Sequence, residues 1–150
     1  MNFVVLDGIG GNLWEKSVAE ILETLTPVSA YVKNDRLGFT VPYTMLGRSH
    51  EYIPDFLVRI APLPDDDTVR TLIVEVSGTL KKAAPTREKA DTARNLWIPG
   101  IHYHGGFGRW GYAELTNPKT FRADLATAIE ALYRGSSEFA REGATAHATA

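Results

Sequence analysis

Two apolar segments on either side of a single turn constrain the fold of this chain more than any other feature. The segments cover residues 55–60 and 71–76, and the turn between them is rich in proline and aspartate. Short apolar segments bounded by such turns predict strands, and one turn between two strands predicts an antiparallel hairpin. Because the second segment carries a continuous aliphatic run, its strand is expected to lie in the centre of a sheet.

This hairpin would bring two carboxylates together. If its turn centres on Asp65, then Asp55 pairs with Glu75, and their Cβ atoms lie about 4.5–5.5 Å apart on one face of the sheet. Two carboxylates at this distance repel each other unless a cation lies between them, and Mg²⁺ prefers oxygen ligands of this kind. The alternative is structural: Asp55 caps a strand, Glu75 is a solvated edge residue, or a slip of one residue turns one carboxylate away.

The rest of the chain predicts helices around this sheet. Apolar residues at helical spacing predict a helix over residues 13–25 and a last amphipathic helix over residues 117–134. Further strands are expected over residues 28–33, 39–45, 101–103 and 110–115, with a loop over 46–51 and a helix over 86–97. The strands 28–33 and 39–45 are expected to pair across a turn. This order predicts an α/β fold with helices packed around a mixed sheet.

Length and composition exclude several classes of protein. The 150 residues predict one domain over residues 1–135 and a disordered tail over residues 136–150. The absence of cysteine excludes disulfides, thiolate zinc sites and cysteine nucleophiles. With a net charge of −2 the chain is not a polycation that coats nucleic acid, although a local patch of positive charge could bind DNA. With no membrane-length apolar run, no signal peptide and no phosphate loop, we expect a cytoplasmic protein without membrane contact and without its own ATP-driven motor.

Several short segments extend the carboxylate pattern into a resemblance to a known family. They are Trp14–Lys16, Ala30–Asn34, Leu37–Phe39, Tyr52–Arg59, Ile73–Val76, Trp97–Gly100 and Gly108–Trp110. In this order they resemble the C-terminal nuclease domain of the restriction (Res) subunits of type III restriction enzymes, within the PD-(D/E)XK nuclease superfamily. The resemblance covers about residues 3–134. It implies a restriction-endonuclease-like αβββαβ core, with a mixed central sheet flanked by helices.

The resemblance also implies an activity and partners. The implied activity is Mg²⁺-dependent endonuclease cleavage of double-stranded DNA. By position, Asp55 and Glu75 would be metal ligands and Glu15 the helical acid that assists them. The cation would polarise the scissile phosphate and lower the pKa of a bound water. The family acts with an ATP-dependent translocase and a modification subunit, and cleavage of both strands implies a homodimer or a second nuclease domain.

The sequence departs from the family pattern at the motif lysine. Two residues after Glu75 stands Ser77, which is on the expected face but cannot supply a positive charge. The charge could come instead from Lys89, on the expected helix, or from Lys81 or Lys82 before it. Lys89 is favoured because a helix holds a side chain more firmly than a loop. The alternative function is a catalytically silent DNA-binding or assembly module that keeps the nuclease fold.

Three cations are candidates for contacts with DNA phosphates. Lys82 and Arg87 lie close together in sequence, and Arg109 follows a glycine-rich segment that could place it on a phosphate. The structural alternatives are a solvated helix face around Arg87 and core packing of the aromatic residues beside Arg109.

Overall fold

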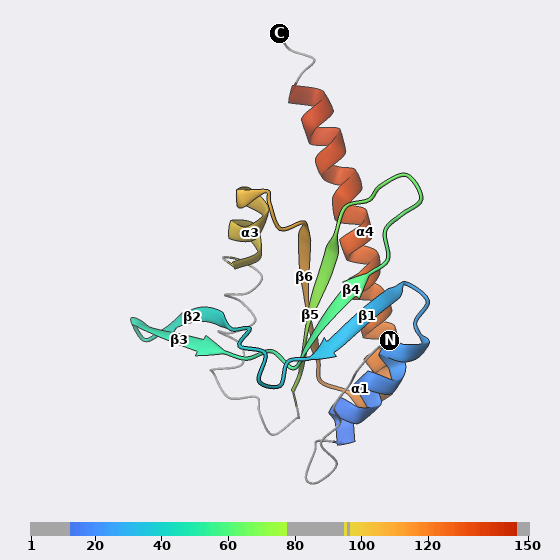
Figure 1. Cartoon of the computed structure of the whole chain (residues 1–150). Coiled ribbons are helices and arrows are strands. Elements are labelled where there is room, and N and C mark those ends of the chain that lie inside the picture. The colour runs from blue at the N-terminus through green and yellow to red at the C-terminus, as the bar shows by residue number, and fades with distance from the viewer. Residues whose placement is uncertain (1–12, 78–94, 96, 147–150) are drawn as a thin grey trace.

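A four-stranded mixed sheet forms the centre of the structure, a computed structural model that describes residues 13–77, 95 and 97–146 (Figure 1). The strand order is β1-β4-β5-β6, with β1, β4 and β5 antiparallel in turn and β6 parallel to β5. The elements are α1 (Leu13–Thr24), β1 (Val28–Lys33), β2 (Val41–Met45), β3 (Arg48–Tyr52), β4 (Phe56–Ile60), β5 (Arg70–Val76), α3 (Ile98–His104), β6 (Arg109–Leu115), the short 3₁₀ helix η3 (Pro118–Thr120) and α4 (Phe121–Ala146). The predicted class, α/β with a mixed sheet, is confirmed at this level.

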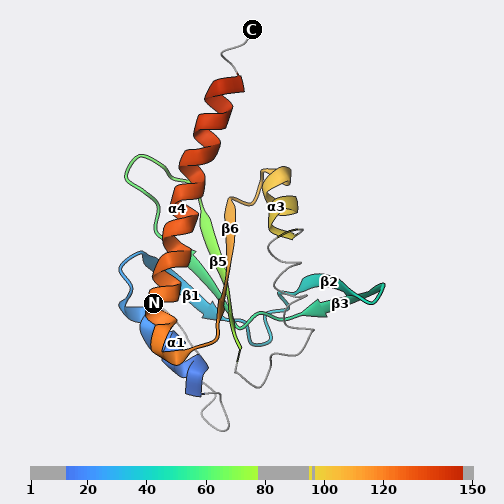
Figure 2. The same ribbon diagram turned by 180° about the vertical axis from the view of Figure 1, so that it is seen from behind.

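Helices α1 and α4 cover one face of the sheet, as the two opposite views show (Figures 1 and 2). Every second residue of β4 faces them, and apolar residues recur at helical spacing along α4, so each element presents one apolar side. At the end of this layer the rings of Trp14 and Phe121 meet edge to face with centroids 5.7 Å apart. The buried core under the helices includes Val18, Leu22, Phe56, Val58, Leu72, Val74, Phe121, Leu125 and Ile129.

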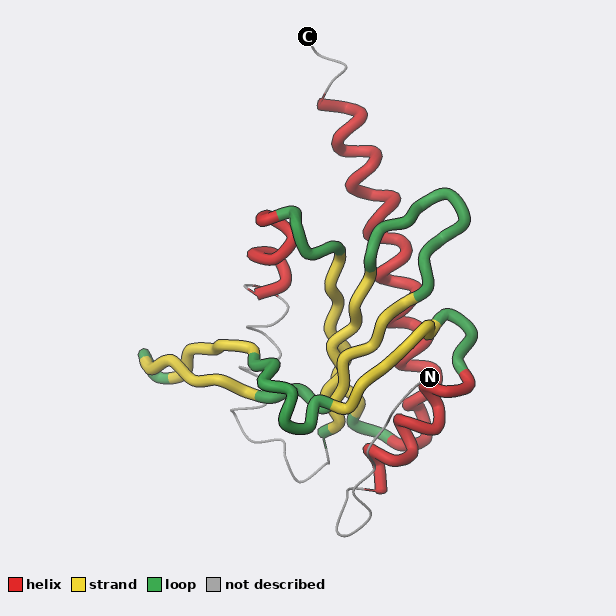
Figure 3. Tube along the Cα trace, viewed as in Figure 1, coloured by secondary structure: helices red, strands yellow, loops and turns green. Residues whose placement is uncertain are grey.

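The other face of the sheet carries the β2–β3 hairpin and α3. A second apolar cluster lies here, with Val41, Tyr43 and Tyr52 from the hairpin buried against Ile73 of β5. Phe39 stacks on Trp110 at a centroid distance of 5.8 Å. The base of the hairpin is therefore packed on the sheet, whereas its tip extends away from it, as the Cα trace shows (Figure 3).

The pairing of the first strands differs from the sequence prediction. β1 pairs with β4, not with residues 39–45, and β2 pairs with β3, which occupies most of the predicted loop. Asn34 explains the difference, because its backbone N–H donates to Asp55 O at 2.8 Å and its side chain donates to Phe39 O at 2.9 Å. These bonds place the end of β1 beside the start of β4 and direct the intervening chain out as a separate hairpin.

The predicted strand over residues 101–103 is wrong, because these residues lie in α3. Pro99 stands in the first turn of α3, where its missing N–H leaves no bond unmade. Gly105, at φ 78°, ends the helix in the left-handed conformation that favours glycine. The predicted helix over residues 86–97 lies almost entirely outside the described residues.

Helix α4 continues past the predicted end at Arg134 to Ala146. The tail predicted to be disordered thus begins as helix, which is consistent with its alanine, glutamate and arginine content. Gly135 does not end the helix: a Cβ there would lie 2.6 Å from Arg109 Nη2, so the glycine makes room for that guanidinium. Neither α4 nor any other helix in the described part is long and apolar enough to cross a membrane.

The turn between β4 and β5 is held by Asp66. This carboxylate accepts hydrogen bonds from the hydroxyl and the backbone N–H of Thr68 and forms an ion pair with Arg70 at 2.5 Å. The bonds from Thr68, followed by that from Arg70, lower the pKa of Asp66 to about 2. Arg70 itself is fully buried and lies over the ring of Tyr133, with 5.2 Å from Cζ to the ring centroid.

Asp66 should make stability depend on pH in the acid range. Because its pKa is lowered in the folded state, ionised Asp66 stabilises the fold above an unfolded pKa of about 4, and this contribution is lost as the pH falls towards about 2. We expect Asp66→Asn to unfold at lower urea concentration at neutral pH and to lose less stability than the wild type over that acid range. The exposed neighbour variant Asp67→Asn should follow the wild type. Parallel pH profiles for wild type and Asp66→Asn would contradict this role.

Candidate carboxylate site

The register of the β4–β5 pair places Asp55 opposite Glu75. Phe56 pairs with Val74 and Leu57 with Ile73, so the same register extended by one residue sets Asp55 across from Glu75. By the two-residue alternation of strands, both acids lie on the face of Leu57 and Ile73, opposite the helices α1 and α4. The predicted antiparallel hairpin and its register are thus confirmed from Phe56 to Ile60, and the pair of Asp55 with Glu75 follows by extension.

A hydrogen bond fixes the position of Asp55. Its Oδ2 accepts from the backbone N–H of Val76 at 2.7 Å, which ties the residue before β4 to the last residue of β5. Asp55 O also accepts the N–H of Asn34 at the end of β1. Asp55 is thus held between two neighbouring strands, and it does have the capping role that the sequence analysis left open, although it still lies beside Glu75.

A third carboxylate, Glu114, extends this row and was not singled out from the sequence. Glu114 is the partner of Glu75 in the parallel β5–β6 pair. Trp110 and Tyr112 pack on the hairpin side of the sheet, so alternation along β6 places Glu114 on that same side. The spacing of Trp110, Tyr112 and Glu114 was the available signal. We name Asp55, Glu75 and Glu114 the carboxylate row.

Two buried tyrosines border the carboxylate row. Tyr52, at the end of β3, is 3% exposed, and the hydroxyls of Tyr52 and Tyr112 are buried, as is Glu75 Oε2. Burial raises the pKa of Tyr52, and the charge of Glu75 raises it further, followed by smaller effects of Asp55 and Glu114. Burial likewise raises the pKa of Tyr112. Both phenols therefore stay protonated at neutral pH, and the charge of Glu75 acts on both of them.

Glu15 lies on α1 and binds Lys33 instead of joining the carboxylate row directly. Its Oε2 lies 3.0 Å from Lys33 Nζ, at the end of β1. The hydrogen bond from Lys33 to Glu15 raises the pKa of Lys33, and the charge of Asp55 adds a small effect in the same direction. Lys33, a cation that the sequence analysis had not considered, pairs with Phe56 on the helical side of the sheet, so this ion pair does not bring Glu15 to the carboxylate row.

Ser77 stands where the family pattern has lysine. It is 3% exposed, and its backbone N–H donates to Leu115 O at 2.9 Å, so the ladder with β6 continues to this residue. Alternation places its side chain on the face of Glu75, as expected. The cations proposed to replace the lysine, Lys81, Lys82 and Lys89, lie outside the described residues, as does Arg87.

Arg109 does not lie beside the carboxylate row. It begins β6, whereas Glu114 is near the end of that strand, and its guanidinium approaches Gly135 of α4 on the opposite face of the sheet. Burial lowers the pKa of Arg109, and the nearby charge of Arg70 lowers it further. The contact of Arg109 with a DNA phosphate stays a prediction; in the structure Arg109 is the first residue of β6 rather than part of the glycine-rich loop.

A shallow pocket lies farther along the hairpin side of the sheet. It has a volume of about 260 Å³ and is lined by residues of β1, β4, β5 and β6, among them Val32, Leu57, Thr71 and Trp110. Arg59, exposed on β4, is the one charged residue among the described residues that line this pocket. Asp55 and Arg59 are four residues apart on one strand face, a separation of about 13 Å.

The donors of the carboxylate row suit a hard divalent cation that keeps its waters. Mg²⁺ in proteins is commonly held by one or two carboxylates together with several waters. Asp55 and Glu75 supply two such groups on neighbouring strands. Over the described ranges, no three His, Asp or Glu side chains group closely enough to hold a metal ion. The row therefore fits an open site with two protein ligands and does not form a closed protein cage.

Comparisons with known proteins assign no family. No protein-family model matches the chain, and no curated protein matches it. Among solved structures, protein VC1899 from Vibrio cholerae matches with 10% sequence identity and a TM-score of 0.30, over 81% of this chain and 32% of that chain. A similarity at this level assigns neither a fold family nor a function.

Asp55 should contribute to stability through its bond to β5. Asp55→Ala leaves the N–H of Val76 without this acceptor, so we expect a loss of about 1–3 kcal/mol in the free energy of unfolding. Asp55→Asn should lose less, because its amide oxygen can accept the same bond. Urea unfolding at neutral pH measures both variants. Equal losses in the two variants would show that the hydrogen bond does not hold Asp55.

Proposed function

We propose that this chain is a Mg²⁺-dependent DNA endonuclease domain, related to the nuclease domain of type III restriction subunits. The observation that carries the proposal is the register that sets Asp55 opposite Glu75 at one end of the central strands. Two carboxylates on adjacent strands can bind a divalent cation. If the two positions served only the stability of the sheet, two apolar residues or one acid and one base would avoid the repulsion between the carboxylates.

The order of the elements supports the same proposal. A helix, α1, precedes three antiparallel strands, β1, β4 and β5, and a long connection then leads to β6, which is parallel to β5. This is the order that a restriction-endonuclease-like αβββαβ core requires. The β2–β3 hairpin is an insertion between the first two strands of that core.

Each side chain around the row has a separate part in the proposed reaction. Asp55 and Glu75 would hold the ion. The ion would polarise the scissile phosphate and lower the pKa of a bound water. Tyr52 and Tyr112 exclude water from the inner side of Glu75 and so strengthen its interaction with a cation. The charge missing at Ser77 would come from Lys89, Lys81 or Lys82, because Lys33 pairs with Phe56 and binds Glu15 on the helical side of the sheet.

One observation favours a second function. Ser77 is buried at the position of the motif lysine, and Lys33 is already engaged by Glu15. A chain with the fold and the acids but without a free catalytic cation would be a catalytically silent DNA-binding or assembly module. A translocase, a modification subunit and a second copy of the chain are partners that either function would take.

Metal-dependent cleavage distinguishes these two functions. The purified chain should nick or linearise supercoiled plasmid with Mg²⁺ or Mn²⁺ and not with EDTA. Glu75→Gln and Asp55→Asn should each reduce the rate by at least about a hundredfold, because each removes one charged metal ligand. Lys89→Ala should slow cleavage without weakening metal binding, because it removes the proposed positive charge and no metal ligand. Glu51→Gln, an exposed acid on β3, is the matched control and should cleave at the wild-type rate.

The silent module predicts a different result. Duplex binding would fall steeply with salt, and no metal would produce cleavage, either alone or with a translocase added. Cleavage that persists in Glu75→Gln would overturn the assignment of the site, even if the chain is a nuclease.

A further inference from the structure

The β2–β3 hairpin is an arm with its base at the carboxylate row. Tyr52 ends β3 beside Glu75, and only two residues separate it from Asp55. Val41 and Tyr43, at the start of β2, are buried against the sheet with Tyr52. From this base the strands extend about 15 Å at strand spacing, and both views show the arm projecting beyond the sheet (Figures 1 and 2).

The tip of the arm carries a leucine against local preference. Leu46 is 93% exposed, with φ 51°, and Gly47 follows with φ 74°, so both residues of this two-residue loop are left-handed. Turns of this kind favour Asn-Gly, because asparagine adopts the left-handed conformation more readily than leucine. The turn therefore gains nothing from leucine, and the side chain contacts almost nothing in the fold.

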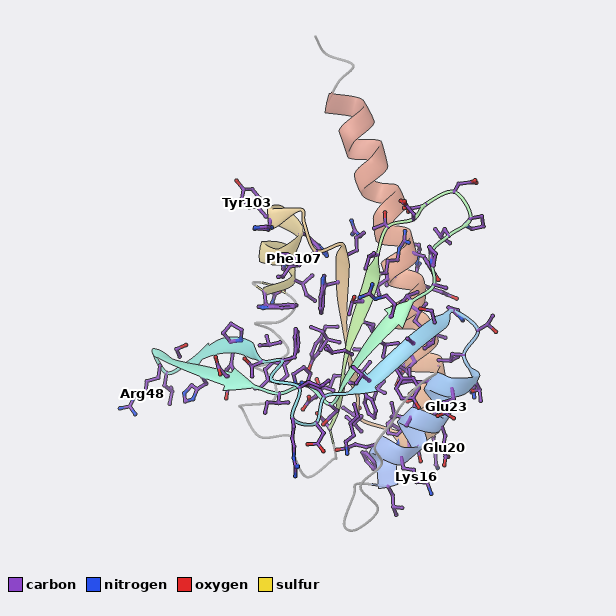
Figure 4. The ribbon with its side chains drawn as sticks, viewed as in Figure 1. Lys16, Glu20, Glu23, Arg48, Tyr103 and Phe107 are labelled. Carbon is purple, nitrogen blue, oxygen red and sulfur yellow. The ribbon has the colours of Figure 1, made fainter. Side chains whose placement is uncertain are left out.

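The polar residues of the arm place positive charge at its tip. Arg48 directly follows the loop, and Figure 4 shows its side chain pointing away from the body of the protein. Farther back, the ring of His50 stacks on Tyr43 at 5.3 Å, and the exposed acid Glu51 lies near the base. An exposed arginine suits an anionic surface on a partner, and an exposed leucine beside it suits stacked apolar groups that lie behind that surface.

We propose that the hairpin tip enters a groove of double-stranded DNA, where Leu46 inserts between base pairs and Arg48 contacts an adjacent phosphate. Minor-groove proteins insert apolar side chains such as leucine in this way and unstack a base step. The tip of the arm would then contact the duplex about 15 Å from the phosphate bound at the carboxylate row. This inference rests on the proposed function, since it takes the same duplex as substrate.

The arm is tested with a duplex that reports unstacking. The probe is a short DNA duplex that contains 2-aminopurine beside a TA step, because TA steps unstack readily. The wild-type chain is titrated into this duplex in EDTA, and the Asp55→Asn variant is titrated into it in Mg²⁺. Wild-type protein should raise the 2-aminopurine fluorescence on binding. Leu46→Asn should abolish the rise in fluorescence and weaken binding at least about tenfold, because the variant lacks the apolar surface that Leu46 would bury between base pairs in the complex. Arg48→Gln should lower the slope of log affinity against log salt by about one.

Two controls distinguish misfolding of the variant from loss of the inserted Leu46 side chain. Leu46→Asn should melt at the same temperature as the wild type or higher, because Asn-Gly is the better turn. Leu13→Asn removes another exposed leucine, 78% exposed at the start of α1 on the helical side, and should bind and unstack as the wild type does.

The outcomes separate this inference from the proposed function. Unstacking by the wild type without metal-dependent plasmid cleavage, either alone or with a translocase added, supports the arm and overturns the nuclease. Cleavage with equal binding and fluorescence in wild type and Leu46→Asn overturns the arm alone, and failure of the wild type to bind any duplex overturns both. Dimerisation on size-exclusion chromatography that Leu46→Asn abolishes, with DNA binding unchanged, would assign the tip to a contact between two copies and overturn the arm as a DNA wedge.

Discussion

The hydrogen bond from Val76 N–H to Asp55 Oδ2 is the contact on which the rest of the site depends. It holds the start of β4 against the end of β5 and so preserves the register that sets Asp55 opposite Glu75. A slip of one residue would send one carboxylate to the face covered by α1 and α4, where Phe56 and Val74 now pack. The same bond lies at the start of β4, where the chain arrives from the β2–β3 hairpin, so it also fixes the base of the arm.

The two faces of the sheet divide stability from chemistry. The helical face holds the large apolar core and the buried Arg70, paired with Asp66. The other face holds the carboxylate row, the phenols of Tyr52 and Tyr112, the pocket with Arg59, and the base of the hairpin. Because strands alternate their side chains, one short segment such as residues 70–76 serves both faces at once.

The sequence predicted the β4–β5 hairpin but not every local pairing, because β1 pairs with β4 and not with the nearer residues 39–45. The β4–β5 register could be predicted because one short turn joins the two strands. Glu114 was missed because β6 reaches β5 through a long connection, and the alignment of parallel strands is set by packing that no turn specifies. The segment around His102 alternates apolar and polar residues over too few positions to distinguish a strand from a helix, and its Pro99 suits a helix start as well as a helix end.

The central claim is that Asp55 and Glu75 together bind one divalent cation. Titration of the chain with Mn²⁺, followed by the electron paramagnetic resonance signal of the free ion, measures this directly and needs no DNA. The account predicts one bound ion per chain, weakened by at least about tenfold in Asp55→Asn and in Glu75→Gln, with a double variant that binds at least as weakly as the weaker single variant. Binding of Mn²⁺ that is the same in the wild type and in both single variants would contradict it.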